Sequence, residues 1–208
     1  MAVITISRKY ASGGRKIGKL LSRRLNYDYV DKYYFQMLAE KLHVSEGTLE
    51  SFERGRHYWI SNAFTKLFSK NYIERIVGYD RTVVEESEYQ DALRSLFIGL
   101  AEKDNVVIVG RAAHFFLQGM QNCYHFLLVA SMDWRRKYAL KTLGALSYKV
   151  ERILEERDIS HAWFLRTICG EHHDDPHSFH LTLNMDLIST DKAAELVADS
   201  VSYFKGTA

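Results

Sequence analysis

The stretch that decides the fold is ISRKYASGGRKIGKLLSRRL, residues 6–25. It reads as the end of an apolar strand, a turn with two adjacent glycines, and a basic amphipathic helix. Amide groups at a helix N-terminus, together with the helix dipole, favour an anion there. The phosphate-loop signature G-x-x-x-x-G-K-[ST] is only half present, because Gly14 is followed by Arg15 and Lys16. On its own, this pattern leaves a plain tight turn between strand and helix as an equal alternative.

Five short apolar runs, each bounded by turn or helix signals, predict strands. In the first, third and fourth runs, β-branched or aromatic residues occupy successive positions, as is typical of parallel strands covered on both faces. Helical patterns separate the runs, so the alternation predicts an α/β doubly wound core. The runs lie at residues 2–7, 27–31, 105–110, 124–130 and 179–185.

Two of the helical patterns show a clear apolar face. The spacing of three and four residues predicts that this face packs on the sheet, with the charged residues outside it. The first face consists of Ile17, Leu20, Leu21 and Leu25, and the second, near the C-terminus, of Ala193, Leu196, Val197 and Val201.

Composition sets the remaining limits. With 208 residues, 47% of them hydrophobic and 26% charged, the chain suits one globular domain. A net charge of +2 neither demands nor excludes an anionic partner. Cys123 and Cys169 form no C-x-x-C motif, which fits a reducing compartment. No secretory signal pattern and no apolar run of about 18 residues are present, so we expect a cytoplasmic protein without membrane contact.

Arginines follow several of the predicted strands. Arg111 comes directly after the third strand, and Arg135 follows the fourth. Ligands of open α/β sheets bind at the carboxyl edge of the strands, so these side chains favour an anionic ligand there. Arg157 and Arg166 lie further along, on a helix or a flexible segment.

Successive blocks of the chain resemble the cytidylate kinase-like proteins, relatives of the P-loop nucleoside monophosphate kinases. Their order is more specific than any single block, and the resemblance thins between residues 45 and 95. The blocks are ITISRKYASGGRKIGKLL, YVDKYYFQMLAEK, VVIVGRAAHFFL, HFLLVASMDWRRKYAL, EERD and DDPHSFHLTLNMDLIS.

The resemblance implies a three-layer P-loop NTPase fold with a five-stranded parallel sheet. The whole chain, residues 1–208, would form one nucleoside monophosphate kinase-like domain. A strand-poor, helix-rich stretch at about residues 33–100 would be the helical insertion that binds the monophosphate, and residues 157–177 would form the lid. The implied reaction is phosphoryl transfer from ATP, with Mg²⁺, to a nucleoside monophosphate, and CMP is the expected acceptor.

The same resemblance assigns roles to individual residues. Arg111 matches the arginine that contacts the acceptor phosphate, Arg157 matches a lid arginine, and Asp31 lies near the strand-end acid before the acceptor-binding helix. Arg15, Arg111 and Arg157 are the expected catalytic residues, and no protein residue is assigned as a metal ligand. We expect Ser12, Gly13, Gly14, Arg15, Lys16 and Asn184 to bind the donor nucleotide, and Asp31, Arg111 and Arg166 to bind the acceptor.

The two basic residues after Gly14 have different expected roles. Related proteins write this stretch as Ser-Gly-Gly-Arg, so the resemblance places Arg15 at the donor phosphates. A guanidinium offers a fork of donors that fits phosphate oxygens. Lys16 is expected on the outer face of the first helical turn.

Two metal supports of the related kinases are missing. Ile17 and Gly18 stand where a hydroxyl residue is expected, and Ala112 replaces the carboxylate after the Gly-Arg pair. Either Ser12 and Asp31 support Mg²⁺ through water, or Arg8, Arg15 and Arg111 supply the charge that other kinases take from the metal. The sequence leaves both possibilities open.

Three further interpretations compete with a kinase. The missing supports also fit a nucleotide-binding protein without turnover that acts as a sensor or scaffold. Nucleic-acid binding by the basic helix at residues 16–24 is disfavoured, because such a face is usually just solvated. The His-rich stretch GEHHDDPHSFH, residues 170–180, matches no standard zinc spacing and is expected to be a polar loop.

Overall fold

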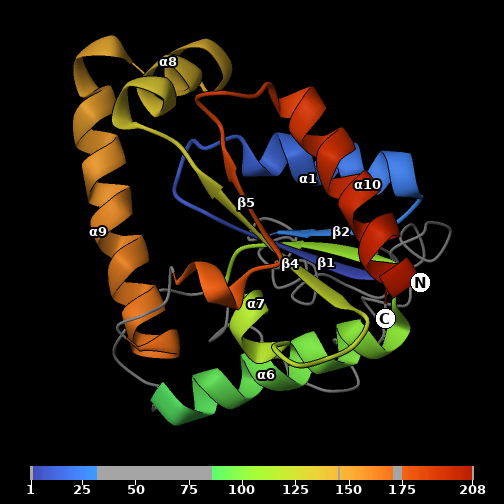
Figure 1. Cartoon of the computed structure of the whole chain (residues 1–208). Coiled ribbons are helices and arrows are strands. Elements are labelled where there is room, and N and C mark those ends of the chain that lie inside the picture. Colours follow the sequence, from blue (N-terminus) through green and yellow to red (C-terminus); the bar gives the residue numbers. More distant parts are fainter. Residues whose placement is uncertain (1, 32–85, 145, 171–174, 208) are drawn as a thin grey trace, which may run out of the picture.

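The computed structural model describes residues 2–31, 86–144, 146–170 and 175–207 (Figure 1). Strands and helices alternate along this part of the chain. In chain order they are β1 (Val3–Arg8), α1 (Gly14–Leu25), β2 (Asp28–Asp31), α6 (Glu86–Lys103), β3 (Val106–Val109), α7 (Ala113–Phe116), β4 (Cys123–Val129), α8 (Met132–Thr142), η1 (Ser147–Lys149), α9 (Val150–Cys169), η2 (Pro176–Ser178), β5 (Leu181–Asn184) and α10 (Thr190–Thr207).

The five strands form one parallel sheet in the order β2-β3-β1-β4-β5. All five predicted strands are confirmed within two residues at each end. The register pairs Ile6 of β1 with Val109 of β3 and with Phe126 of β4. The carboxyl ends of these strands therefore lie along one edge, and the connections that follow them meet there.

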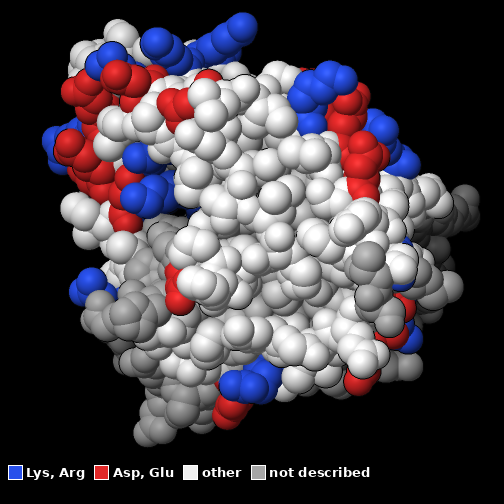
Figure 2. Space-filling view, viewed as in Figure 1, with Lys and Arg blue, Asp and Glu red and all other residues white. Residues whose placement is uncertain are grey.

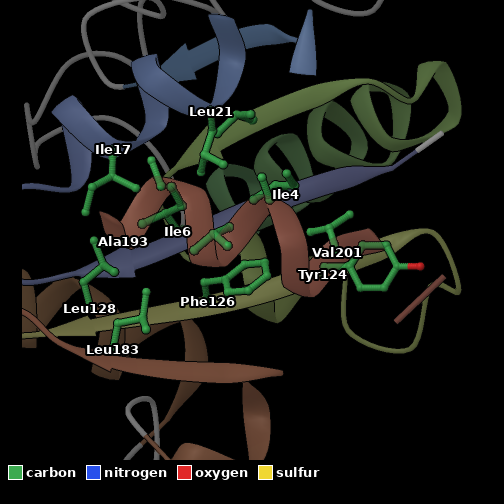
Figure 3. Packing of buried hydrophobic residues seen from close by; sticks show 14 of the residues in the cluster. Ile4, Ile6, Ile17, Leu21, Tyr124, Phe126, Leu128, Leu183, Ala193 and Val201 are labelled. Carbon is green, nitrogen blue, oxygen red and sulfur yellow. The ribbon is translucent and has the colours of Figure 1, made fainter. Parts of the chain in front are cut away.

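Helices cover both faces of the sheet, which gives three layers (Figure 1). On one face, α1 and α10 pack on the sheet through a core that includes Ile4, Ile17 and Phe126 (Figure 3). On the other face, α6 and α7 pack through Phe97 and Phe116, which join Val30 and Ile108 of the sheet. The predicted α/β architecture is confirmed.

Helix α1 follows its sequence pattern. Ile17 and Leu21 are fully buried, whereas Lys19 and Arg23 are exposed. The helix ends at Asn26, which adopts the left-handed conformation that commonly terminates helices.

Helix α10 differs from its prediction at Leu196, which is exposed and does not belong to the buried face. The buried residues are Ala193, Ala194, Val197, Ala198 and Val201. Each residue turns a helix by about 100°, so Leu196 lies about 130° from the centre of that stripe. Small alanines let α10 approach α1 and the sheet closely, and this explains why the alanines replace the leucine at the contact.

Most of the predicted helical insertion, from residue 33 to residue 85, lies outside the described residues. Its last part belongs to α6, which packs on the sheet. The predicted lid begins in the middle of α9, a single helix that runs past the carboxyl edge of the sheet (Figure 1). Among the helices in the described ranges, none combines the length and apolar character that crossing a membrane requires.

Candidate phosphate-binding site

The turn between β1 and α1 has the backbone of an anion site. Gly13 precedes the helix with a φ of 82°, a conformation that glycine adopts without strain, and Ile17 donates its amide to the Gly13 carbonyl at 3.0 Å. Ser12 is buried, and in the part of the chain that the structure describes its Oγ has no hydrogen-bond partner. Buried hydroxyl groups are normally hydrogen-bonded, so this hydroxyl is available to bind a ligand. Ser12, Gly13 and Gly14 thus lie together at the N-terminus of α1, as predicted.

Gly13 is enclosed by residues from two other connections. A Cβ atom at this position would lie 2.9 Å from Cγ2 of Thr190, the first residue of α10, and 3.5 Å from the ring of Trp134 on α8. The Trp134 ring also stacks on Tyr138, with 5.0 Å between centroids. The segments after β4 and β5 therefore reach the same turn, on the side opposite β3.

Arg15 points toward the end of β2. Its Nε donates to Asp31 Oδ2 at 3.2 Å, and the Tyr29 hydroxyl donates to the same oxygen at 2.7 Å. The Asp31 side chain is nearly buried, whereas that of Arg15 is about half exposed. Burial, with the nearby Asp31 charge, raises the pKa of the Tyr29 hydroxyl, which therefore stays protonated as a donor. The structure brings together Arg15, predicted at the donor phosphates, and Asp31, predicted at the acceptor.

Lys16 points the other way. Its Nζ donates to Asp191 Oδ2 at 2.7 Å, and both side chains are largely exposed. Lys16 and the Thr190 hydroxyl lower the pKa of the Asp191 carboxyl. Lys16 accordingly joins α1 to the first turn of α10 on the outer side of the helix.

The turn after β3 is strained. Gly110, Arg111 and Ala112 all have positive φ values, 82°, 57° and 55°, before α7 begins. Left-handed backbone at a residue other than glycine costs about 1–3 kcal/mol and is concentrated at functional sites. The Gly110 amide donates to the Ile6 carbonyl at 2.9 Å, so this turn is tied to β1. Arg111 thus lies at the carboxyl edge beside the β1–α1 turn, as its sequence position predicts.

Arg135 fastens α8 and α9 to the β1–α1 turn. Its guanidinium binds both oxygens of Asp158 on α9, at 2.8 and 2.7 Å, and also donates to the Tyr10 carbonyl at 3.3 Å. The Arg135 side chain is only 4% exposed. Ala11 of the turn packs in a small core with residues of α8 and α9. Two helices are therefore held against the turn by a buried ion pair and by apolar contacts.

Arg157 and Arg166, both in the predicted lid, were predicted to lie at the site. The structure places Arg157 at the turn and Arg166 further along α9. The Arg157 guanidinium lies 5.8 Å from the centroid of the Tyr10 ring, so it faces the turn. Arg166 is in the last turn of α9, nine residues or about 13.5 Å of helix further on. Charged side chains of both signs cover α8 and α9 on the outside (Figure 2).

Asn184 ends β5 at the same edge, but its side chain serves the local turn. Its Oδ1 accepts the Asp186 amide at 3.0 Å. The Asp186 carboxylate in turn accepts bonds from the amide and the hydroxyl of Ser131 after β4. These bonds lower the pKa of Asp186 and fix the segments after β4 and β5 to each other.

A buried polar layer, which no sequence pattern predicted, lies below the site. Thr5 is hydrogen-bonded to His125 at 2.8 Å, and Ser7 to His114 at 2.9 Å. Burial, with the neighbouring histidines, lowers the pKa of His125 to about 3. His180, from the His-rich stretch, packs beside His125. Across residues 2–31, 86–144, 146–170 and 175–207, no three His, Cys, Asp or Glu side chains form a metal cluster.

This combination of a parallel 2-3-1-4-5 sheet and a glycine turn before the first helix defines a P-loop kinase fold. The chain belongs to the cytidylate kinase-like family, which matches residues 3–187. A comparison with curated protein sequences gives no match.

Solved structures share the fold at low sequence identity. An uncharacterized protein from Eubacterium ventriosum ATCC 27560 is 15% identical, with a TM-score of 0.66 and 97% of this chain and 98% of that chain covered. Shikimate kinase from Acinetobacter baumannii, in complex with shikimate, is 10% identical, with a TM-score of 0.51 and coverage of 98% and 94%. A gluconokinase from Sinorhizobium meliloti 1021 is 12% identical, with a TM-score of 0.50 and coverage of 100% and 93%. At these identities the likeness shows the fold alone.

Several residues at the site were not predicted from the sequence. Tyr10 lies in the turn and faces Arg157, whereas Trp134, Thr190 and Asp191 contact the turn or the first turn of α1. Each lies in a segment that follows a strand, so strand-end position was the available signal. Residue type provided no signal for the aromatic residues and the threonine, because such residues more often serve in packing.

Proposed function

We propose that this protein transfers the terminal phosphoryl group of ATP to a nucleoside monophosphate, with CMP as the acceptor. The observation that carries the proposal is the β1–α1 turn. Ser12, whose buried hydroxyl has no partner among the described residues, and the left-handed Gly13 lie at a helix N-terminus. Arg111 lies in the turn after β3 at the same edge, and Arg157 faces the β1–α1 turn. Phosphoryl transfer needs such positioning and charge stabilisation more than covalent chemistry.

The residues divide between the two ligands. The amides of Ser12 to Gly14 would bind the donor phosphates, and Asn184 would contact the donor base. Arg111 and Asp31 would bind the acceptor. Arg15, paired with Asp31, stands between these two groups and would neutralise the transferring phosphoryl group, with Arg157 closing from the lid.

The site fits phosphate groups better than a bare metal ion. Asp31 Oδ2 already accepts two hydrogen bonds, and the first turn of α1 offers no hydroxyl. Mg²⁺ keeps several waters and is often held by one carboxylate and the substrate phosphates, where it neutralises their charge. Ser12 and Asp31 are the residues that would support it through water.

A nucleotide-binding protein without turnover is the second candidate. It is favoured by the absence of an acid at Ala112 and by the engagement of Asp31 with Arg15. In that case the same site would bind ATP and a monophosphate without making a diphosphate.

Product analysis separates these candidates. The protein would be incubated with ATP, Mg²⁺ or Mn²⁺, and one acceptor at a time: CMP, the other nucleoside monophosphates, shikimate and gluconate. Formation of ADP and CDP supports the proposal. Product only with shikimate or gluconate would correct the acceptor, and ligand binding without any product would establish the non-catalytic alternative.

A further inference from the structure

Arg8 lies across the glycines of the candidate site. A Cβ atom on Gly14, the first residue of α1, would lie 2.9 Å from Cγ and 3.2 Å from Cδ of Arg8. A Cβ atom on Gly110 would lie 2.7 Å from Nη1 and 2.8 Å from Cζ of the same side chain. The Arg8 stem therefore occupies the space where a side chain at position 14 would begin, and its guanidinium rests on the turn after β3.

The spacing of the phosphate-loop signature gives this contact a meaning. If Gly13 and Gly14 stand at the last glycine and the lysine of G-x-x-x-x-G-K, the first glycine of the signature falls on Arg8. Gly13 supports this register, because it is the left-handed residue that closes the loop before the helix. A lysine is thus missing at position 14, and an arginine is present at position 8, where the signature has glycine.

We infer that Arg8 supplies the cation that the loop lysine supplies in other P-loop proteins, reaching the donor phosphates from the end of β1 rather than from α1. The two changes compensate in space, because a glycine at position 14 makes room for the arginine stem. Lysine at that position normally reaches the β- and γ-phosphates. A guanidinium has the donor geometry to bind the same oxygens.

The location of the guanidinium agrees with this role. Ile6 pairs with Val109, so Arg8, the last residue of β1, lies beside the turn after β3 that contains Arg111. A phosphate at the N-terminus of α1 would lie beside both turns. Arg8 would bind the donor there, while Arg15 would remain on Asp31 toward the acceptor.

This inference rests on the proposed function, and titration calorimetry with ATP tests the two separately. Arg8→Met keeps an unbranched stem over Gly14 and removes the charge. Lys9→Met is the matched control, because Lys9 is the exposed neighbour with the same charge. We expect Arg8→Met to weaken ATP binding by at least tenfold and Lys9→Met to change it by less than threefold.

A second test replaces residues 8 and 14 with the residues of the phosphate-loop signature. Arg8→Gly should lose ATP affinity, and adding Gly14→Lys to it should restore the affinity to within a few-fold of wild type. Gly14→Lys alone should lower thermal stability without ligand, because the Arg8 stem occupies the space, and Arg8→Gly should relieve that loss.

Equal ATP affinity in Arg8→Met and Lys9→Met would overturn the role of Arg8. Loss of ATP binding in Arg15→Ala with full binding in Arg8→Met would overturn it in favour of the neighbouring register. If wild type itself binds no ATP, the proposed function fails, and the Arg8 inference fails with it. Gly14→Ala should destabilise the wild-type protein more than it destabilises the Arg8→Gly variant. Equal losses of stability would show that the Arg8 stem does not fill this space.

Discussion

Arg15 and Asp31 are joined by a hydrogen-bonded ion pair, 3.2 Å from Nε to Oδ2, which links the first turn of α1 to the end of β2. The Asp31 side chain is nearly buried and that of Arg15 about half exposed, so Arg15 is the more accessible partner of the pair. The pair thus connects the part of the site assigned to the donor with the part assigned to the acceptor.

We predict that Arg15→Ala sharply lowers turnover, while Lys16→Ala changes it by only a few-fold. The two side chains point in different directions: Arg15 faces Asp31 inside the site, and Lys16 faces Asp191 on the outer side of the helix. Steady-state rates on both variants measure this. The reverse ranking would show that Lys16 is the basic residue at the reacting phosphates.

Arg111→Ala should weaken the monophosphate much more than ATP, by about 2 kcal/mol, since a guanidinium can bind a phosphate through two parallel hydrogen bonds. Arg111→Gly is the matched variant, because it removes the same guanidinium and relieves the positive φ of 57°. It should bind as weakly as Arg111→Ala but be more stable by about 1 kcal/mol. Equal loss of both ligands in Arg111→Ala would indicate a structural role.

The Arg135–Asp158 pair should be the most important polar contact between α8 and α9. Asp158→Ala leaves a buried guanidinium without its carboxylate, and we expect a loss of about 3 kcal/mol in the free energy of unfolding. The exposed pair between Arg152 and Glu156 on the same helix is the control, and Glu156→Ala should leave stability unchanged. Urea unfolding compares the variants. Similar, small effects at both sites would mean that α9 is not fastened through Arg135.

Stability should fall as the pH is lowered below about 6.5. The pKa of His125 is about 3 in the folded state and has its ordinary value of 6.5 in the unfolded chain. Between these two pH values the unfolded chain binds more protons than the folded protein. Above pH 6.5 both states are neutral and the effect vanishes. Thr5, His180 and His114 surround the ring, and the pKa of His180 is also lowered by burial. Urea unfolding at pH 7.5 and 5.5 should show a smaller difference in His125→Gln than in wild type, and an unchanged difference would contradict this origin.

Much of the fold was predictable from short-range patterns. Burial on both faces of the sheet leaves continuous apolar runs at the strands, and packing of one face of α1 leaves a helical period in the sequence. Leu196 was placed wrongly because a stripe of small alanines, rather than the larger leucine, lies against the sheet.

The site was predictable only in outline. Arg111 could be placed at the carboxyl edge from its position after a strand. The path of Arg8 over Gly14 and Gly110 could not, because it joins residues through side-chain packing between separate turns. The buried Thr5–His125 and Ser7–His114 pairs were also invisible, since nothing local marks a polar residue as buried.

Calorimetric titration of the wild-type protein with ATP, and separately with CMP, tests the central claim most directly. The account predicts that each ligand binds at up to millimolar concentration, and that saturation with one leaves the other able to bind, because the two occupy neighbouring parts of one edge. No binding of either nucleotide at millimolar concentration would contradict the claim that the β1–α1 turn is a nucleotide-phosphate site.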